Sequence, residues 1–213
     1  IDAWKQEHPM VIKDANDMLN PQEVIEYACD HSDKETVVVT DVGQHQMWAA
    51  QYVKQTKPRN FLSSGGLGTM GFGYGAAIGA QMGNPGKRVI HITGDGSFHM
   101  NLNEACTAVS NNLPIITIIF NNTVLGMVYQ WQTAFYGKRY SNTTPNRKTN
   151  FSKLIEAFGG NGFRVNNMEE FAEAYQKALT LEGPTWIDCN IAVEDKVLPM
   201  IPNGKTIDDM LFE

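Results

Sequence analysis

The segment RVIHITGDGS, residues 88–97, joins an apolar, β-branched run to a Gly-Asp-Gly-Ser turn. A second run, IITIIF at 115–120, is followed by Asn121, Asn122 and Thr123. Neither run shows the polar alternation of a half-exposed strand, which indicates strands that are buried on both faces. Each strand thus ends on polar groups at its carboxyl end, which is the edge where open α/β sheets bind ligands.

Strand and helix patterns alternate around this pair of strands. Further strands are predicted at 36–40 and 186–191. Periodicity and capping signals predict helices at 20–29, 45–52, about 99–110, 126–136, 151–158 and 168–181. Apolar strands that alternate with helices predict an α/β fold, namely a doubly wound, mainly parallel sheet with helices on both faces.

The composition suits one domain that spans residues 1–213, with a lead-in segment at 1–19 and a C-terminal tail at 197–213. The chain has 42% hydrophobic residues, and 17 Lys and Arg against 23 Asp and Glu give a net charge of -6. This charge gives no electrostatic reason to expect nucleic acid as a partner. No stretch approaches the length of a membrane span, so we expect no membrane partner.

The three cysteines are Cys29, Cys106 and Cys189. They are odd in number, far apart and set among apolar residues, which indicates neither a disulfide framework nor a metal cluster and favours a reducing, cytoplasmic compartment. The chain begins with Ile1 rather than Met, so we expect it to be an excised or processed part of a longer protein.

Asp95 and Asn122 lie 27 positions apart, which leaves room for one crossover helix and a return strand. We therefore expect both side chains at neighbouring strand ends. Mg²⁺ prefers oxygen ligands and usually takes one or two protein carboxylates together with phosphate and water. Gly94 and Gly96 let the backbone turn sharply, and backbone N–H groups with the Ser97 hydroxyl can meet phosphate oxygens.

Each half of this pattern has a simpler interpretation, because Asp-Gly and Asn-Asn are ordinary turn sequences. Their combination is more specific, since each turn follows an apolar strand at a spacing that suits one crossover. A third feature, SSGGLGTMGFGYG at 63–75, holds six glycines and predicts a close backbone approach to a ligand or to another segment.

The GDG turn, 24 further residues and then Asn-Asn resemble the motif of thiamine-diphosphate enzymes. Four stretches resemble acetolactate synthase, also called acetohydroxyacid synthase: TDVGQHQMWAAQ at 40–51, SGGLGTMGFG at 64–73, GMVYQW at 126–131 and VLPMIP at 197–202. The resemblance runs from about residue 11 to the end and implies the C-terminal, thiamine-diphosphate-binding fold of the catalytic subunit. One departure is Tyr74-Gly75, where this family usually has Leu-Pro, and it puts the rigidity of the following helix start in doubt.

The resemblance assigns roles to individual residues. It implies that Mg²⁺ is held by Asp95, Asn122 and the main-chain carbonyl of Val124. The implied cofactor contacts are Val42, Gly43, Gln44, His45, Gly68, Met70, Gly94, Gly96, Ser97, Gly126 and Met127. Within that set, the Gly68 carbonyl accepts a hydrogen bond from the 4'-amino group and Met70 lies beneath the folded cofactor. His45 receives its role only from the resemblance.

Met127 and Trp131 are four residues apart on a predicted helix, and such spacing alone is typical of a stripe that faces the core. The resemblance instead places both at the substrate entrance, where the tryptophan favours a bulkier second ketoacid. Packing of the indole against an ethyl group is the physical reason that we expect.

The implied reaction condenses two pyruvates, or pyruvate and 2-ketobutyrate, to an acetohydroxyacid with loss of CO₂, the first common step of branched-chain amino acid biosynthesis. Cofactor activation in this family depends on a glutamate of the pyrimidine-binding domain, so no complete catalytic set is expected in this chain, which alone should be inactive. The implied partners are the pyrimidine-binding domain of a second catalytic subunit in a homodimer, and a small regulatory subunit. FAD is expected only in the full-length enzyme.

Two other interpretations stay open. One is the same domain of a related enzyme, such as a pyruvate oxidase, pyruvate decarboxylase or glyoxylate carboligase. GMVYQW and LPMIP favour acetolactate synthase over these relatives. The other is a non-catalytic dinucleotide-binding module, which is disfavoured because no acidic residue lies at a strand end about twenty positions after the glycines.

Overall fold

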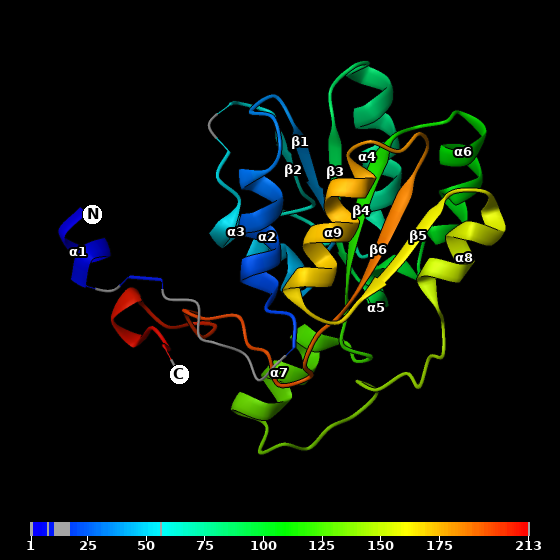
Figure 1. The fold of residues 1–213 in the computed structure, drawn as a ribbon. Helices are drawn as coiled ribbons and strands as arrows, with labels where there is room; N and C mark the ends of the chain where they lie inside the picture. The colour runs from blue at the N-terminus through cyan, green and yellow to red at the C-terminus, as the bar shows by residue number, and fades with distance from the viewer. Residues whose placement is uncertain (1, 8, 11–17, 56, 213) are drawn as a thin grey trace.

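A computed structural model describes residues 2–7, 9–10, 18–55 and 57–212 (Figure 1). Its centre is a six-stranded sheet in the order β2-β1-β3-β4-β6-β5, and every neighbouring pair is parallel. The strands are β1 (Val37–Thr40), β2 (Phe61–Leu62), β3 (Val89–Gly94), β4 (Ile115–Asn121), β5 (Asn161–Val165) and β6 (Thr185–Asn190). The predicted α/β class with a parallel sheet is confirmed.

Helices cover both faces of this sheet, as Figure 1 shows. They are α1 (Asp2–Glu7), α2 (Pro21–Asp30), α3 (Gln44–Tyr52), α4 (Phe72–Gly83), α5 (Asp95–Phe98), α6 (Ala105–Ser110), α7 (Gly126–Phe135), α8 (Phe151–Phe158) and α9 (Met168–Ala178). One face packs against α2, α3 and α9, and the other against α4, α5, α6 and α8. Helix α7 lies beyond the strand ends, outside both layers.

The apolar runs are explained by this two-sided burial. In β4, Ile116 and Ile118 point into the cluster that α2, α3 and α9 cover. The alternate residues Ile115 and Ile119 point to the opposite face, against α4 and its neighbours. Because successive side chains of a strand face opposite sides, a strand between two helical layers is buried on both, which explains the apolar or β-branched side chains of β4 from Ile115 to Phe120.

The start of α2 shows the predicted cap. The Asn20 side chain accepts a hydrogen bond from the Gln22 backbone N–H at 2.9 Å, and Pro21 occupies the first helical position. Helix α4 begins at Phe72, two residues before the Tyr74-Gly75 departure. The Tyr74 side chain is fully buried, and its hydroxyl accepts a hydrogen bond from Trp186 Nε1 at 3.1 Å, so tertiary packing holds this helix start.

The single helix predicted at about 99–110 is wrong. Helix α5 ends at Phe98, a 3₁₀ turn follows at Leu102–Glu104, and α6 begins only at Ala105. Asn101 interrupts the helical backbone with φ -147° and ψ 22°. The apolar spacing continues across this break, which is why periodicity suggested one helix.

The expectation of apolar surroundings is wrong for one of the three cysteines, Cys106. All three are free thiols, but Cys106 is exposed on α6, whereas Cys29 is half-buried and packs against the apolar core. The apolar neighbours of Cys106 in the sequence face the sheet, whereas its own position on the helix faces outward. Only Cys189, in β6, is buried.

The tail at 197–213 is described as far as residue 212. It carries an antiparallel bridge between Met200 and Leu211 and a short 3₁₀ helix at Ile207–Asp209. Figure 1 shows this end and α1 on the same side of the molecule. The lead-in at 1–19 lies partly outside the described residues, because positions 1, 8 and 11–17 are not among them.

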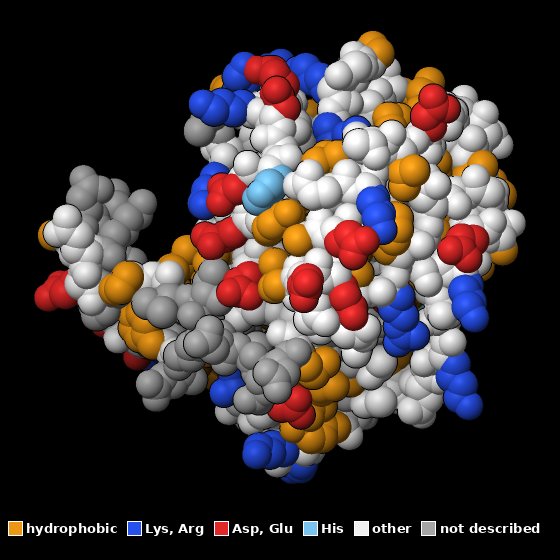
Figure 2. Space-filling model, viewed as in Figure 1, with side chains coloured by type: hydrophobic (Ala, Val, Ile, Leu, Met, Phe, Trp, Pro, Cys, Tyr) orange, Lys and Arg blue, Asp and Glu red, His pale blue; other side chains and the backbone are white. Residues whose placement is uncertain are grey.

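In Figure 2 the surface over α2 and α9 differs in side-chain type from the surface over α7. Acidic side chains spread over α2 and α9, whereas hydrophobic side chains gather where α7 lies. Val128 and Phe135 of α7, with Tyr136 just after it, are exposed. Across the described residues, no helix has the length and apolar character needed to cross a bilayer.

Candidate functional site

A cavity of about 110 Å³ lies at the carboxyl edge of the sheet, and its lining follows the ends of β1, β3 and β4. Strands β2 and β3 flank β1 on opposite sides, so the chain reverses its direction across the sheet at β1. Ligands of open α/β sheets bind outside the strand ends at such a reversal. The volume is below the ~300–1,000 Å³ of common ligand pockets, which fits one part of a larger site.

Thirteen residues predicted from the sequence line this cavity together. They are Val42, Gly43, Gln44, His45, Met70, Gly94, Asp95, Gly96, Ser97, Asn122, Val124, Gly126 and Met127. Gly68 and Trp131 lie outside its lining. Five mostly apolar wall residues were missed: Trp48, Phe120, Leu125, Val128 and Ile191. Their apolar character gave no signal that separates them from core residues.

The two predicted side-chain metal ligands follow neighbouring strands. Asp95 directly follows β3 and is 3% exposed, while Asn122 directly follows β4 and is 6% exposed. Burial raises the pKa of Asp95 to about 6, against the opposing effect of the Arg147 guanidinium. A divalent cation at this carboxylate would favour its charged form and offset the cost of burial.

The residues present fit a magnesium diphosphate. Asp95 and Asn122 offer one carboxylate and one amide oxygen, the ligand types that Mg²⁺ prefers. His45 lines the cavity with a buried Nε2 that has no hydrogen-bond partner within the described structure. Burial lowers the pKa of His45 to about 4, so the ring is neutral near pH 7. A neutral ring whose buried nitrogen lacks a partner is suited to a ligand hydrogen bond.

Gly126 makes room at the same place. A Cβ added there would collide with the Oε1 atom of Gln44 and would lie 2.8 Å from the Nδ2 atom of Asn122. Only glycine therefore lets α7 begin this close to the two amides. This is the physical reason for the Gly126-Met127 helix start.

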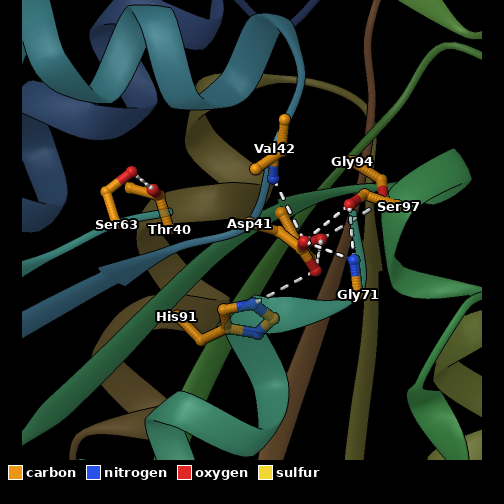
Figure 3. Close-up of polar contacts among 9 residues, drawn as sticks. Thr40, Asp41, Val42, Ser63, Gly71, His91, Gly94 and Ser97 are labelled. Atoms are coloured by element: carbon orange, nitrogen blue, oxygen red, sulfur yellow. Dashed lines mark hydrogen bonds and ion pairs between the residues drawn. The ribbon is translucent and has the colours of Figure 1, made fainter. Parts of the chain in front are cut away.

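Asp41 holds three segments of the site together through hydrogen bonds. The sequence indicated only that this residue follows a strand. Its Oδ1 atom accepts hydrogen bonds from Ser97 Oγ at 2.6 Å, Gly71 N at 2.8 Å and Val42 N at 3.1 Å, as Figure 3 shows. The carboxylate is 1% exposed. A single buried oxygen thus joins the ends of β1, α5 and the glycine-rich loop.

The glycine-rich segment is held at both ends by consecutive residues of β1 and its extension. Thr40 Oγ1 donates to Ser63 Oγ at 2.8 Å, and Asp41 accepts from Gly71 (Figure 3). Between these anchors Gly68 has φ 67°, a left-handed conformation that favours glycine. Leu67 is 89% exposed, so the loop projects outward and leaves Met70 at the cavity.

His91 lies next to this network without joining it. Its Nε2 atom is 3.9 Å from Asp41 Oδ2, which is too long for a hydrogen bond. Burial lowers the pKa of His91 to about 3, so the ring stays neutral and forms no ion pair. It packs against Tyr74 and Phe98, with ring centroids 5.6 and 5.8 Å away.

Met127 and Trp131 form a second hollow beside the cavity. Its volume is about 340 Å³, and its lining adds Val128, Gln132 and Tyr136. Both residues are half-buried, so the core-stripe interpretation is wrong for this helix. Met127 and Val128 line both hollows, which are therefore adjacent.

Residues 41–189 match the family described as "Thiamine pyrophosphate enzyme, C-terminal TPP binding domain", where thiamine pyrophosphate (TPP) is thiamine diphosphate. The chain is 43% identical over 212 residues to the acetolactate synthase large subunit of Pyropia yezoensis, with 99% of this chain and 36% of that protein covered. It is 41% identical over 225 residues to acetolactate synthase 1, chloroplastic, of Nicotiana tabacum, covering 99% and 34%.

It is also 39% identical over 209 residues to the acetolactate synthase isozyme 2 large subunit of Escherichia coli (strain K12), covering 98% and 37%. The chain spans about a third of the length of these curated relatives. The family match covers every residue of the cavity lining except Ile191, including both predicted side-chain metal ligands. The chain therefore belongs to the family of C-terminal TPP-binding domains of thiamine pyrophosphate enzymes.

Proposed function

We propose that this chain is the part of an acetolactate synthase catalytic subunit that holds the diphosphate of TPP through Mg²⁺. One observation carries the proposal. A single cavity gathers all three metal candidates and ten of the eleven cofactor candidates, every one except Gly68. Relatives named acetolactate synthase match almost the whole chain, which favours this enzyme over other TPP enzymes.

Different residues would bind the metal, the diphosphate and the other end of the cofactor. Asp95, Asn122 and the carbonyl of Val124 would hold Mg²⁺, and the segments at 42–45, 96–97 and 126–127 would bind the diphosphate. Gly68 and Met70 would contact the other end of the cofactor. When bound, TPP supplies the carbanion chemistry of the reaction, and the protein supplies its binding and orientation.

The second hollow is the proposed substrate entrance. Trp131 and Met127 present apolar surface there beside the cofactor cavity. A second ketoacid with an ethyl group would gain apolar contact relative to one with a methyl group. The acetohydroxyacid products from pyruvate, and from pyruvate with 2-ketobutyrate, follow from this proposal.

The remaining expectations stay predictions. They are the activating glutamate on the pyrimidine-binding domain of a second catalytic subunit, the homodimer, the small regulatory subunit, FAD in the full-length enzyme and the cytoplasmic location. Carboligation should appear only when the complementary domains are supplied. Acetolactate production by the purified 213-residue chain alone would refute the division of the active site.

Metal-dependent cofactor binding tests the proposal directly. Trp48 lines the cavity and provides a fluorescence signal. We expect TPP to change this fluorescence only with Mg²⁺ present, and Asp95→Ala and Asn122→Ala to abolish the change. Asp33→Ala, on the exposed turn before β1, is the matched control. Tight binding that needs no metal and survives both site variants would overturn the assignment.

A further inference from the structure

Helix α7, which is described over its whole length, buries one residue, and that residue is the polar Gln130. The amide of Gln130 is fully bonded. Its Oε1 accepts from the Val197 backbone N–H at 3.0 Å, and its Nε2 donates to the Val197 carbonyl at 3.1 Å. A buried amide in an otherwise half-exposed helix indicates a role for its hydrogen bonds rather than for apolar packing.

These two contacts fix which way the Gln130 amide points. A backbone N–H can only donate and a backbone carbonyl can only accept. Reversing the Gln130 amide would set its NH₂ group against the Val197 N–H and its oxygen against the Val197 carbonyl. The C-terminal tail therefore determines that the Oε1 of Gln130 faces inward, toward Gln44.

Two acceptors fix the orientation of the Gln44 side-chain amide. Its Nε2 donates to Gln130 Oε1 at 2.8 Å and to the Asp195 carbonyl at 2.8 Å. With its NH₂ group committed to these acceptors, its Oε1 faces Asn122 and accepts from Asn122 Nδ2 at 3.3 Å. The contacts of the tail thus fix the orientation of the Gln130 amide, which fixes that of Gln44, which in turn fixes that of Asn122 at the end of β4.

Asn122 is the last of the three hydrogen-bonded side-chain amides. Its NH₂ group is used by Gln44, so its Oδ1 is turned the other way and accepts from the Val124 N–H at 3.2 Å. A carbonyl oxygen has two lone pairs, which leaves one for a cation. A reversed amide would present N–H donors to the cation and would repel it.

We propose that Gln130 is a positioning residue for the metal site: with Gln44 it orients Asn122 so that an oxygen, not an NH₂ group, faces the cation. This inference rests on the proposed function, because it takes Asn122 as a metal ligand. Partners that orient metal ligands typically change metal affinity by about 10–100-fold when they are removed. We call Gln130, Gln44 and Asn122 the amide relay.

The probe is Mn²⁺, whose binding in the presence of TPP is followed by electron paramagnetic resonance on the 213-residue chain. Gln130→Met removes the acceptor for Gln44 and should weaken Mn²⁺ binding by about tenfold.

Gln132→Met is the matched control. Gln132 lies on the same helix and makes the same paired contact to a backbone, with Ser141 N at 2.9 Å and Ser141 O at 3.3 Å, but away from Asn122. It should leave Mn²⁺ affinity unchanged. A loss equal to that of Gln130→Met would mean that any disturbance of α7 weakens binding, and the relay would be wrong.

The decisive measurement is made in an Asn122→Asp background. Aspartate offers oxygen in either orientation, so it needs no relay to present one. Gln130→Met should then change Mn²⁺ affinity by less than about threefold, against about tenfold with Asn122 present. An equal loss in both backgrounds would overturn the inference, because it would show a general structural effect.

The metal site itself is tested by separate variants. If the parent chain binds no Mn²⁺, or if Asp95→Ala binds it equally well, the proposed function fails. If the parent binds, Asp95→Ala does not, and Gln130→Met matches the parent, the metal site stands and the relay alone fails.

Discussion

The hydroxyl of Ser97 donates a 2.6 Å hydrogen bond to the carboxylate of Asp41, and these two residues follow different strands, β1 and β3. The same carboxylate oxygen accepts from the Gly71 N–H. Ser97 is a proposed diphosphate contact, and Gly71 follows Met70 directly. Asp41 therefore joins the proposed diphosphate contact Ser97 to the glycine-rich loop that carries Met70.

Asp41→Asn should weaken both stability and cofactor binding. The neutral amide weakens the charge-assisted bonds from Ser97, Gly71 and Val42, and hydrogen bonds to charged groups contribute about 1.5–3 kcal/mol. We expect the free energy of unfolding, measured in urea, to fall by about 2–3 kcal/mol. The exposed variant Asp33→Asn should change it by less than about 0.5 kcal/mol, and equal effects of the two variants would contradict a special role for Asp41.

Gly126→Ala should disrupt the amide relay by steric displacement. The new methyl group would occupy the position of the Gln44 Oε1 atom. We expect TPP affinity in the presence of Mg²⁺ to fall at least about tenfold by fluorescence titration. Gly79→Ala, in α4 with open space around it, is the control and should be neutral or stabilising by up to about 1 kcal/mol. Unchanged TPP affinity in Gly126→Ala would contradict the tight contact.

Trp131→Leu should alter substrate choice in the complete enzyme. Trp131 lines the second hollow, and one methylene in a hydrophobic pocket contributes about 1–3 kcal/mol. We expect the preference for 2-ketobutyrate over pyruvate, measured from the product ratio, to fall about tenfold. Phe135 packs edge-on against Trp131 at 5.4 Å but lies outside the lining, so Phe135→Leu should preserve the ratio. A ratio that shifts equally in both variants would place selectivity elsewhere.

His91 should make stability depend on pH. Burial lowers its pKa to about 3, below the ordinary value of 6.5. Between these values the unfolded chain binds the extra proton, so the free energy of unfolding falls as pH drops through this window, by up to about 1.4 kcal/mol per unit, and is unaffected above it.

His91→Leu removes this dependence and two buried nitrogens that lack partners within the described structure. The pH slopes of the parent and the variant, measured by urea unfolding, should therefore differ between about pH 3 and 6.5 and coincide above this window. Parallel curves from pH 7 to pH 4 would show that His91 is protonated equally in both states. Burial, with a smaller effect of His91, lowers the pKa of the nearby His45 to about 4, so the difference between the two proteins also contains the change in His45 that follows loss of His91.

The central strands could be predicted because burial between two helical layers makes them mostly apolar or β-branched on both faces. Strands β2 and β5 could not. The first has only two residues, and the second reads Asn-Gly-Phe-Arg-Val with an exposed Arg164. Both lie at the edges of the sheet, where one side of the strand has no neighbour and the apolar signal is weak.

Some residues of the candidate site could likewise be predicted from the sequence, and others could not. The position of Asp95 and Asn122 at one cavity could be predicted, because ligands bind at strand ends and the spacing fits one crossover. Gln130 could not be found, because a glutamine between apolar helix residues looks like a surface position. Its partner is the Val197 backbone, 67 residues away, and a backbone group has no signature in the sequence.

The relay also sets when the site can form during synthesis. Its contacts join residues 78, 86 and 151 positions apart, and the last of these needs Asp195. Contacts of such sequence separation form only after long loops have closed. A nascent chain whose sheet has already folded would still lack the contacts of Gln44 and Gln130 until Asp195 and Val197 had left the ribosome, so the proposed relay would form after the sheet.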